Sequence, residues 1–171
     1  YSGYDQWENW VGNAGGVFAI GVALFPTVEQ GPLGTVAFIH YASAMGTSPL
    51  GQTSSHNLSI DSLKGYLYLE GTSAAGESIF IHDLSNPAFP AYVGSFGVGS
   101  SGIHDMYAMN DTVYVAAGFS PYFSIFDMAD KQAPVEIARV NIPSAGYVHN
   151  IWPNRDGTRV ITTEETAGKT I

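Results

Sequence analysis

Residues 82–96 read HDLSNPAFPAYVGSF, and residues 126–140 read FDMADKQAPVEIARV, so the second stretch starts 44 residues after the first. The two stretches align without a gap. Each holds the end of an apolar strand, an aspartate, a polar turn, a proline and a second apolar strand. Because an aspartate can accept backbone N–H groups and close a turn, we predict that Asp83 and Asp127 do so in the two copies.

The repeat extends in both directions from these copies. FIHY at residues 38–41 matches FIHD at residues 80–83, and a proline opens the strand after each copy, at Pro49, Pro90 and Pro134. A period in the forties with several short strands per unit is typical of β-propeller blades. The sequence therefore predicts an all-β fold, a β-propeller of four-stranded blades.

A second marker, His followed by Asn or Asp, recurs once per unit. Its copies are His56-Asn57, His104-Asp105 and His149-Asn150. The marker divides one predicted domain, residues 1–171, into approximate units of residues 4–55, 56–103 and 104–148 and a shorter unit of residues 149–171. About three and a half blades are thus visible, whereas a propeller closes with about four to eight.

Alternation with a period of two and the positions of turn residues place the individual strands. Four are expected near residues 57–60, 66–70, 78–83 and 91–96, and four more near residues 105–109, 112–117, 122–127 and 135–140. Others are expected near residues 17–22, 35–41 and 159–162, with a short one near residues 50–53. The dipeptides Asn110-Asp111 and Asp156-Gly157 are expected to form tight turns between strands.

The ends of the chain bear on how the ring closes. The chain begins at Tyr1 rather than Met and stops at Ile171, within a predicted blade. We therefore expect a processed or partial chain. Either the rest of a longer chain or other protein subunits would complete the propeller.

Composition excludes several classes of function. The net charge is −9 with 6 Lys and Arg in total, whereas nucleic-acid binding needs clustered basic residues, so no nucleic-acid partner is expected. Cysteine is absent, which excludes disulfides, thiol catalysis and cysteine–zinc sites. No apolar run reaches the roughly 18–20 residues of a membrane span, so no direct span is predicted and any anchor is expected elsewhere.

The repeated unit resembles that of the LVIVD-repeat proteins, including the choice-of-anchor B group of bacterial and archaeal surface proteins. The similar elements are the strand–Asp–turn–Pro–strand units at residues 79–96 and 123–140 and the three His markers. The resemblance implies a β-propeller exported to the periplasm or the cell surface, often through a lipid or membrane anchor. The chain departs from the family pattern at Tyr41, where the Asp is missing, and at Tyr4, where the His is missing.

The His markers are the strongest candidates for chemistry. In a propeller, equivalent positions of successive blades converge on one axis, so His56, His104 and His149 are expected to form an arc of imidazoles. Asp105 would lie beside them, and Glu164 follows the third His by one hairpin. Imidazole and carboxylate groups are ligands of divalent transition metals, and an acidic neighbour also suits the role of orienting a ligating His. These five residues are therefore candidate metal ligands.

Other interpretations of the same residues stay open. A His in each unit can equally hydrogen-bond the neighbouring blade and fix the crossover, or bind an anionic ligand. Adjacent strand residues point to opposite faces, so at most one of Glu164 and Glu165 faces the channel. The aromatic residues at the His end favour core packing, with carbohydrate or partner stacking as the alternative. They are Trp7, Trp10, Trp152, Tyr4 and Tyr147.

The leading functional hypothesis is non-enzymatic. It is an extracytoplasmic β-propeller that acts as a protein-interaction or scaffold subunit of a surface or membrane-associated assembly. It depends on the family resemblance, on the lack of a complete catalytic motif in the sequence, and on a chain that cannot close its own ring. The alternative is a metal-binding propeller enzyme, an oxidoreductase or hydrolase with the His arc at its channel, and a third hypothesis is a sugar-binding module.

Overall fold

Every regular element in the described part of the chain is a β-strand. The computed structural model describes residues 56–70, 78–86, 90–99 and 102–166, together with the backbone of three earlier strands. The strands are β1 (Gly12–Ala14), β2 (Val17–Ala23), β3 (Val36–Ala42), β4 (Asn57–Asp61), β5 (Tyr66–Glu70), β6 (Ser78–Asp83), β7 (Ala91–Gly97), β8 (Asp105–Met109), β9 (Thr112–Ala116), β10 (Tyr122–Asp127), β11 (Val135–Asn141), β12 (Val148–Pro153) and β13 (Val160–Glu164).

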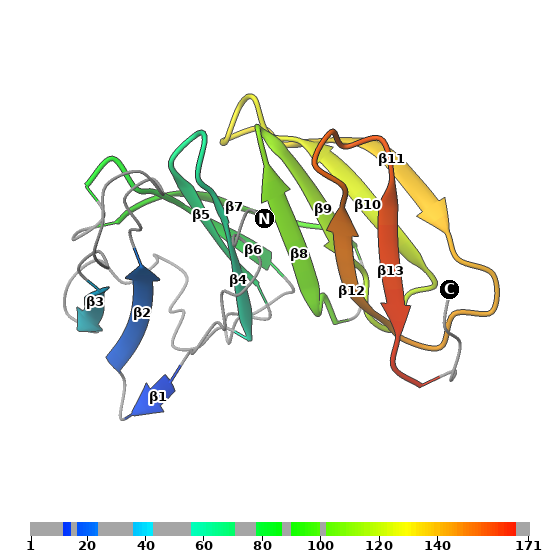
Figure 1. Ribbon diagram of the computed structural model, residues 1–171, viewed down its shortest axis with the longest axis horizontal. Coiled ribbons are helices and arrows are strands. Elements are labelled where there is room, and N and C mark those ends of the chain that lie inside the picture. Colours follow the sequence, from blue (N-terminus) through cyan, green and yellow to red (C-terminus); the bar gives the residue numbers. More distant parts are fainter. Residues whose placement is uncertain are drawn as a thin grey trace.

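The strands form antiparallel sheets in which neighbours in the sheet are also neighbours in sequence (Figure 1). Two sheets have four strands, β4–β7 and β8–β11; β1–β3 form a three-stranded sheet and β12–β13 a two-stranded hairpin. The predicted all-β class, the four-stranded units and the strands that fall on described residues are confirmed. The expected short strand near residues 50–53 and Pro49 lie outside the described residues.

The repeated aspartates close turns as the sequence predicts. Asp83 Oδ1 accepts the backbone N–H of Ser85 at 2.6 Å, and Asp127 Oδ1 accepts that of Ala129 at 2.8 Å. Pro90 and Pro134 directly precede β7 and β11. Both sheets also carry a register shift at the same place, between Ile81 and His82 in one and between Ile125 and Phe126 in the other. The two stretches that are similar in sequence therefore share the same turn hydrogen bond and a β-bulge at the same position.

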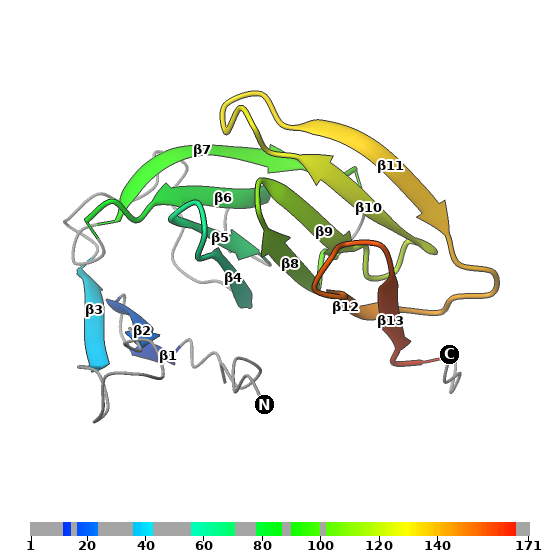
Figure 2. The ribbon, with the colours of Figure 1, turned by 45° about the horizontal axis from the view of Figure 1, so that its top comes forward.

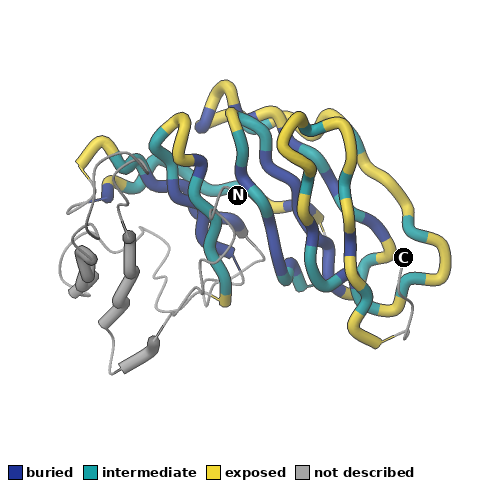
Figure 3. Tube along the Cα trace, viewed as in Figure 1, coloured by how far each residue is buried: buried dark blue, intermediate teal, exposed yellow. Residues whose placement is uncertain are grey.

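Two apolar cores join the sheets. The first lies between β4–β7 and β8–β11 and contains Tyr68, Ile79, Ile81, Met106, Val113, Val115 and Phe126. The second lies between β8–β11 and the β12–β13 hairpin and contains Tyr114, Ala116, Val148 and Ile151. Because side chains alternate along a strand, the β8–β11 sheet fills one core with each of its faces. The buried residues, dark blue in Figure 3, lie along the central strands, whereas the turns are largely exposed.

The first strand of each repeat forms the inner row of the assembly. β4, β8 and β12 lie side by side, whereas β7 and β11 lie at the outer side (Figures 1 and 2). Residues at the start of β4, β8 and β12 therefore meet at one end of the row, and the turns that follow these strands meet at the other end. In the described part of the chain, no helix is long and apolar enough to cross a membrane.

Gly118 joins the β8–β11 sheet to the hairpin. Its N–H donates to the carbonyl of Val148 at 3.2 Å, and the N–H of Val148 donates back at 2.8 Å. Its φ is +56°, and a Cβ there would lie 1.7 Å from the carbonyl oxygen of Gly102. Only glycine fits such a position without strain.

We expect Gly118→Ala to lower the free energy of unfolding by about 2–3 kcal/mol, because the substitution adds a steric clash to the cost of positive φ. The matched control is Gly65→Ala, where φ is +75° but no atom lies within 4 Å of the added Cβ. It should cost only about 1 kcal/mol. Urea denaturation measures both values, and equal losses would show that the approach of Gly118 to Gly102 is unimportant.

Candidate functional site

The three His markers meet at one end of the inner row. The Nε2 atoms of His56 and His104 are 2.9 Å apart, and the centroids of these rings are 4.5 Å apart. The ring centroids of His104 and His149 are 3.9 Å apart. The predicted arc of imidazoles is confirmed, because equivalent positions at the start of neighbouring strands do converge.

Backbone hydrogen bonds hold the main chain of His56 and of His104 in place. The N–H of His56 donates to the carbonyl of Glu70 at 2.9 Å, and the N–H of His104 donates to the carbonyl of Ala116 at 3.3 Å. In each case the partner is the last residue of the second strand of the same sheet, β5 or β9. The two imidazoles are thus carried by rigid strand pairs.

The protonation pattern of the imidazoles follows from their acceptors. His104 Nδ1 lies 3.0 Å from the carbonyl oxygen of His149, and a carbonyl only accepts, so Nδ1 carries the proton. Neutral His104 therefore presents a lone pair at Nε2, which faces His56. His149 Nδ1 makes a short hydrogen bond to Asn150 Oδ1, which fixes the same tautomer in His149.

A buried carboxylate orients the residues beside the imidazoles. Asp105 Oδ1 accepts Asn57 Nδ2 at 2.8 Å, while its Oδ2 accepts Asn150 Nδ2 at 3.2 Å and the N–H of Ile151 at 3.1 Å. We call this set the Asn–Asp–Asn ladder, residues Asn57, Asp105 and Asn150. Because the Nδ2 of Asn150 points to Asp105, its Oδ1 points to His149. Asp105 therefore acts on the imidazole arc through a neighbour.

Burial and neighbouring groups shift the pKa of His104 and the pKa of Asp105. Burial lowers the pKa of His104, and the nearby His149 and His56 lower it further, while the hydrogen bond that His104 donates to the His149 carbonyl opposes them. Burial also raises the pKa of Asp105, although the hydrogen bonds from Ile151 and Asn150 partly oppose this change. Neutral His104 is favoured, so its Nε2 is available as a base or as a metal ligand.

The side chains of Glu164, the last residue of β13, and of Glu165, which follows it, make separate contacts, as strand alternation predicts. Glu164 Oε2 accepts the N–H groups of Gly146 at 2.7 Å and Tyr147 at 3.1 Å, so it holds the loop before β12. Glu165 Oε2 lies 3.8 Å from His149 Nε2. Glu165 is therefore a carboxylate within ion-pair distance of the arc, and ligation by the candidate Glu164 stays a prediction.

Aromatic side chains cover one side of the arc. Tyr147 meets the edge of His104 with ring centroids 5.4 Å apart, and Phe119 meets Tyr147 at 4.6 Å. Phe119 is itself exposed. The sequence pattern indicated Tyr147 but not Phe119, since Phe119 belongs to the loop that the Gly118 bridge brings to β12. Trp7, Trp10 and Tyr4 lie outside the described residues.

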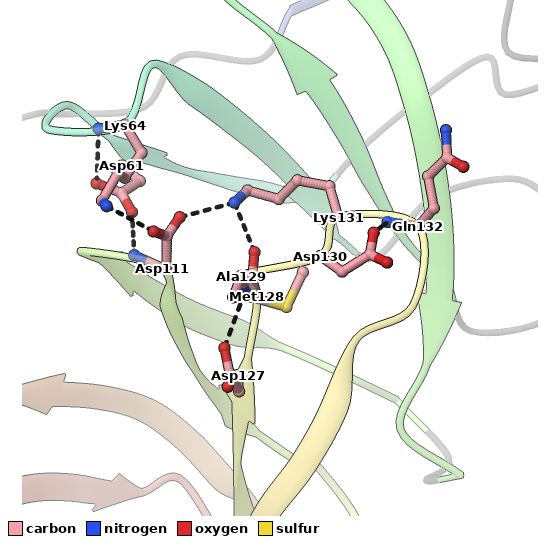
Figure 4. A network of polar contacts seen from close by, with 9 residues as sticks. All are labelled: Asp61, Lys64, Asp111, Asp127, Met128, Ala129, Asp130, Lys131 and Gln132. Carbon is pink, nitrogen blue, oxygen red and sulfur yellow. Dashed lines mark hydrogen bonds and ion pairs between the residues drawn. The ribbon is translucent and has the colours of Figure 1, made fainter.

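A second polar network joins the sheets at the opposite end of the inner row (Figure 4). Asp111 accepts Lys131 Nζ at 2.7 Å and pairs with Lys64 Nζ at 2.6 Å. Asp61, which is buried, accepts the N–H of Asp111 at 2.8 Å. Burial raises the pKa of Asp111, but the two ammonium groups outweigh it and hold that pKa below its usual value.

This second network is structural. Lys131 also donates to the carbonyl of Met128 and lies over the Tyr66 ring at 4.4 Å, so its ammonium is fully occupied. Asn110 and Asp111 both have positive φ, 49° and 58°, which confirms the predicted tight turn. The turns of the two sheets are therefore locked together while the opposite end presents the imidazoles.

No group of three or more His, Asp or Glu side chains arranged to hold a metal ion occurs among residues 56–70, 78–86, 90–99 and 102–166. The arrangement does offer paired imidazole nitrogens with defined tautomers. Comparison with known proteins adds no identity: no protein family matches the chain, and no curated protein is significantly similar to it.

Proposed function

We propose that the two four-stranded sheets and the β12–β13 hairpin are consecutive blades of a β-propeller that serves as a protein-interaction or scaffold subunit. Part of its surface is the far face of the hairpin, where a further β-sheet docks. That sheet comes from the rest of a longer polypeptide or from another subunit. This docking does not involve the imidazole arc.

One observation carries this proposal, the register of cross-strand pairs in successive sheets. Ser59 pairs with Tyr68, Tyr107 with Tyr114, and Trp152 with Ile161. The first residues of these pairs are 48 and 45 positions apart, the same spacings as His56, His104 and His149. The three pairs are therefore equivalent positions.

The equivalent positions differ in what covers them. Tyr68 packs against the β8–β11 sheet and is 0% exposed, and Tyr114 packs against the hairpin and is 5% exposed. Ile161 is 67% exposed and Trp152 is 53% exposed. The opposite face of the hairpin is already buried through Ile151. The apolar pair Trp152 and Ile161 is thus exposed. At the equivalent position, each of the two preceding sheets packs against the sheet that follows it.

Covering this pair is energetically favourable. Fully burying a side chain of this size stabilises a protein by about 1.5–3 kcal/mol. The outer strand β11 also exposes Val135 and Ile137, which adds apolar surface outside the cores. Exposed apolar groups of this kind are typical of surfaces that contact other protein segments.

We expect Ile161→Glu to disrupt the docking of the further sheet in the native protein. If another subunit supplies the sheet, light scattering after size exclusion will show a fall in molecular mass. If the same polypeptide supplies it, the mass will stay constant and the free energy of unfolding will fall by about 2–3 kcal/mol. Leu63→Glu is the matched control, since Leu63 is 76% exposed on the turn after β4. Identical behaviour of the two variants would contradict the proposal.

The location outside the cytoplasm is proposed on the resemblance to LVIVD-repeat surface proteins. Its support is the repeated Asp–turn–Pro unit, whose turns at Asp83 and Asp127 have the same hydrogen bond. Fractionation of the source cells, with protease added to intact cells, tests it. Protein in the cytoplasmic fraction that resists protease until lysis would refute this part of the proposal.

A further inference from the structure

We propose that His56 and His104 bind one divalent transition-metal cation through their Nε2 atoms. This site is independent of the docking face on the hairpin. The two atoms are 2.9 Å apart, and they come from neighbouring sheets. Two nitrogen ligands about 2.0–2.1 Å from a metal and at a right angle to each other, as in the square-planar geometry of Cu²⁺ and Ni²⁺, are separated by about 2.9 Å.

His104 is already arranged as a ligand. Its Nδ1–H donates to the backbone carbonyl of His149 at 3.0 Å, so its lone pair is at Nε2. A ligating His in a metal site usually donates its other ring N–H to a carbonyl or carboxylate, which fixes the tautomer and the ring orientation. In this site, the carbonyl of His149 supplies that support.

His56 is the adaptable partner. It is exposed, and with His104 in the Nδ1–H form its own Nε2–H donates the hydrogen bond that joins the two rings. When a metal enters, the Nε2 proton of His56 passes to solvent and its Nδ1 takes up a proton, so the ring stays neutral and both Nε2 lone pairs face the cation. This change of tautomer releases no net proton.

The Asn–Asp–Asn ladder keeps the two rings in register. Asp105 joins Asn57, which follows His56, to Asn150, which follows His149. The chain of contacts thus spans all three inner strands directly beneath the imidazoles. Asp105 and His149 are positioning residues here, and the remaining coordination positions are open to water or to an added ligand.

Imidazole ligands suit Zn²⁺, Cu²⁺ and Ni²⁺, among which Cu²⁺ generally binds most tightly. The test is titration of the native protein, without any histidine tag, with Zn²⁺ and Cu²⁺ alone by calorimetry. We expect one ion per chain, with affinity falling at least about tenfold in His56→Ala and in His104→Ala. His82→Gln is the matched control, because it removes a histidine from β6, which lies outside the inner row, and its affinity should stay within about threefold of wild type.

Imidazole ¹⁵N NMR of the wild-type protein keeps the test independent of variants. Before metal is added, we expect His104 to be protonated at Nδ1 and His56 at Nε2, and Zn²⁺ should shift the Nε2 resonances of both. An Nε2-protonated His104, no binding at millimolar Zn²⁺ and Cu²⁺, or an equal loss of affinity in His82→Gln would each overturn the assignment.

Discussion

Asp105→Ala is expected to lower the free energy of unfolding by about 3–5 kcal/mol, because each buried donor left without an acceptor costs about 1–3 kcal/mol. The substitution removes the acceptor of Asn57, Asn150 and the N–H of Ile151, which belong to β4 and β12, the strands on either side of β8. Asp105 is itself buried. Urea denaturation followed by circular dichroism measures the loss.

Asp83→Ala is the matched control for this substitution. Asp83 accepts one hydrogen bond, from Ser85 in an exposed turn, so its loss should cost about 0.5–1.5 kcal/mol. Asp105→Asn keeps the shape of the side chain but turns one acceptor into a donor, and we expect an intermediate loss. If all three variants lose the same stability, the Asn–Asp–Asn ladder does not hold the inner strands together.

The effect of Asp105 on the arc can be separated from its effect on stability. Without Asp105, the amide of Asn150 loses the acceptor of its Nδ2 and keeps the hydrogen bond from Thr163 to its Oδ1, so the acceptor that fixes the tautomer of His149 is held less firmly. Imidazole ¹⁵N NMR of Asp105→Asn should therefore show a mixture of tautomers at His149. His104 should keep its Nδ1 proton, since its acceptor is a backbone carbonyl.

The strands and the His arc could be predicted from the sequence because both are periodic. The Asp–turn–Pro unit fixes the boundaries of β6, β7, β10 and β11, and a constant spacing brings His56, His104 and His149 to equivalent positions. Where every sheet repeats the same path, an equivalent residue number implies an equivalent place in space.

The partners of individual side chains could not be predicted in the same way. The carboxylate of Asp105 bonds two asparagines at equivalent positions, because residues at one position of the repeat face one another across sheets. The ion pairs of Asp111 with Lys64 and Lys131 depend on which turns meet, and each lysine comes from a different turn. The repeat places these residues in the turns at the ends of strands, but it does not predict which lysine pairs with which aspartate.

Glu164 shows how local irregularity limits such predictions. Strand alternation separates Glu164 from Glu165, yet a register shift between Val148 and Ile151 alters the pairing of β12 with β13. Glu164 lies opposite Val148 and holds the loop before β12, and Glu165 Oε2 lies 3.8 Å from His149 Nε2. A bulge carries no strong sequence signal, so choosing the glutamate required the three-dimensional register.

Glu70→Gln is expected to remove a loss of stability that the wild-type protein undergoes as the pH rises from about 4.5 to 9. Glu70 is fully buried, and burial, with a smaller effect from the Asp105 charge, raises its pKa to about 9. The folded state therefore holds a proton that the unfolded state has released between about pH 4.5 and pH 9. The stabilising contribution of this proton is complete below pH 4.5 and is lost as the pH rises through 9.

The expected size follows from that difference in pKa. Each pH unit within the window changes the free energy of unfolding by up to about 1.4 kcal/mol, so the wild type has lost about 3 kcal/mol of this contribution at pH 7. Glutamine mimics the protonated carboxyl and cannot ionise. Urea denaturation from pH 5 to pH 9 should show wild-type stability falling relative to Glu70→Gln, whatever constant offset the new amide introduces.

His82 on the neighbouring strand β6 provides a control of opposite sign. Burial lowers its pKa to about 4, so the unfolded state binds more protons between pH 4 and the ordinary value of 6.5. Its contribution is lost as the pH falls, and His82→Gln should diverge from wild type only in acid. Asp105→Asn removes the negative charge that helps to raise the pKa of Glu70, so that pKa should fall. The loss of stability that Glu70 causes should then end at a lower pH. Parallel curves for wild type and Glu70→Gln would mean that Glu70 does not hold its proton in the folded protein.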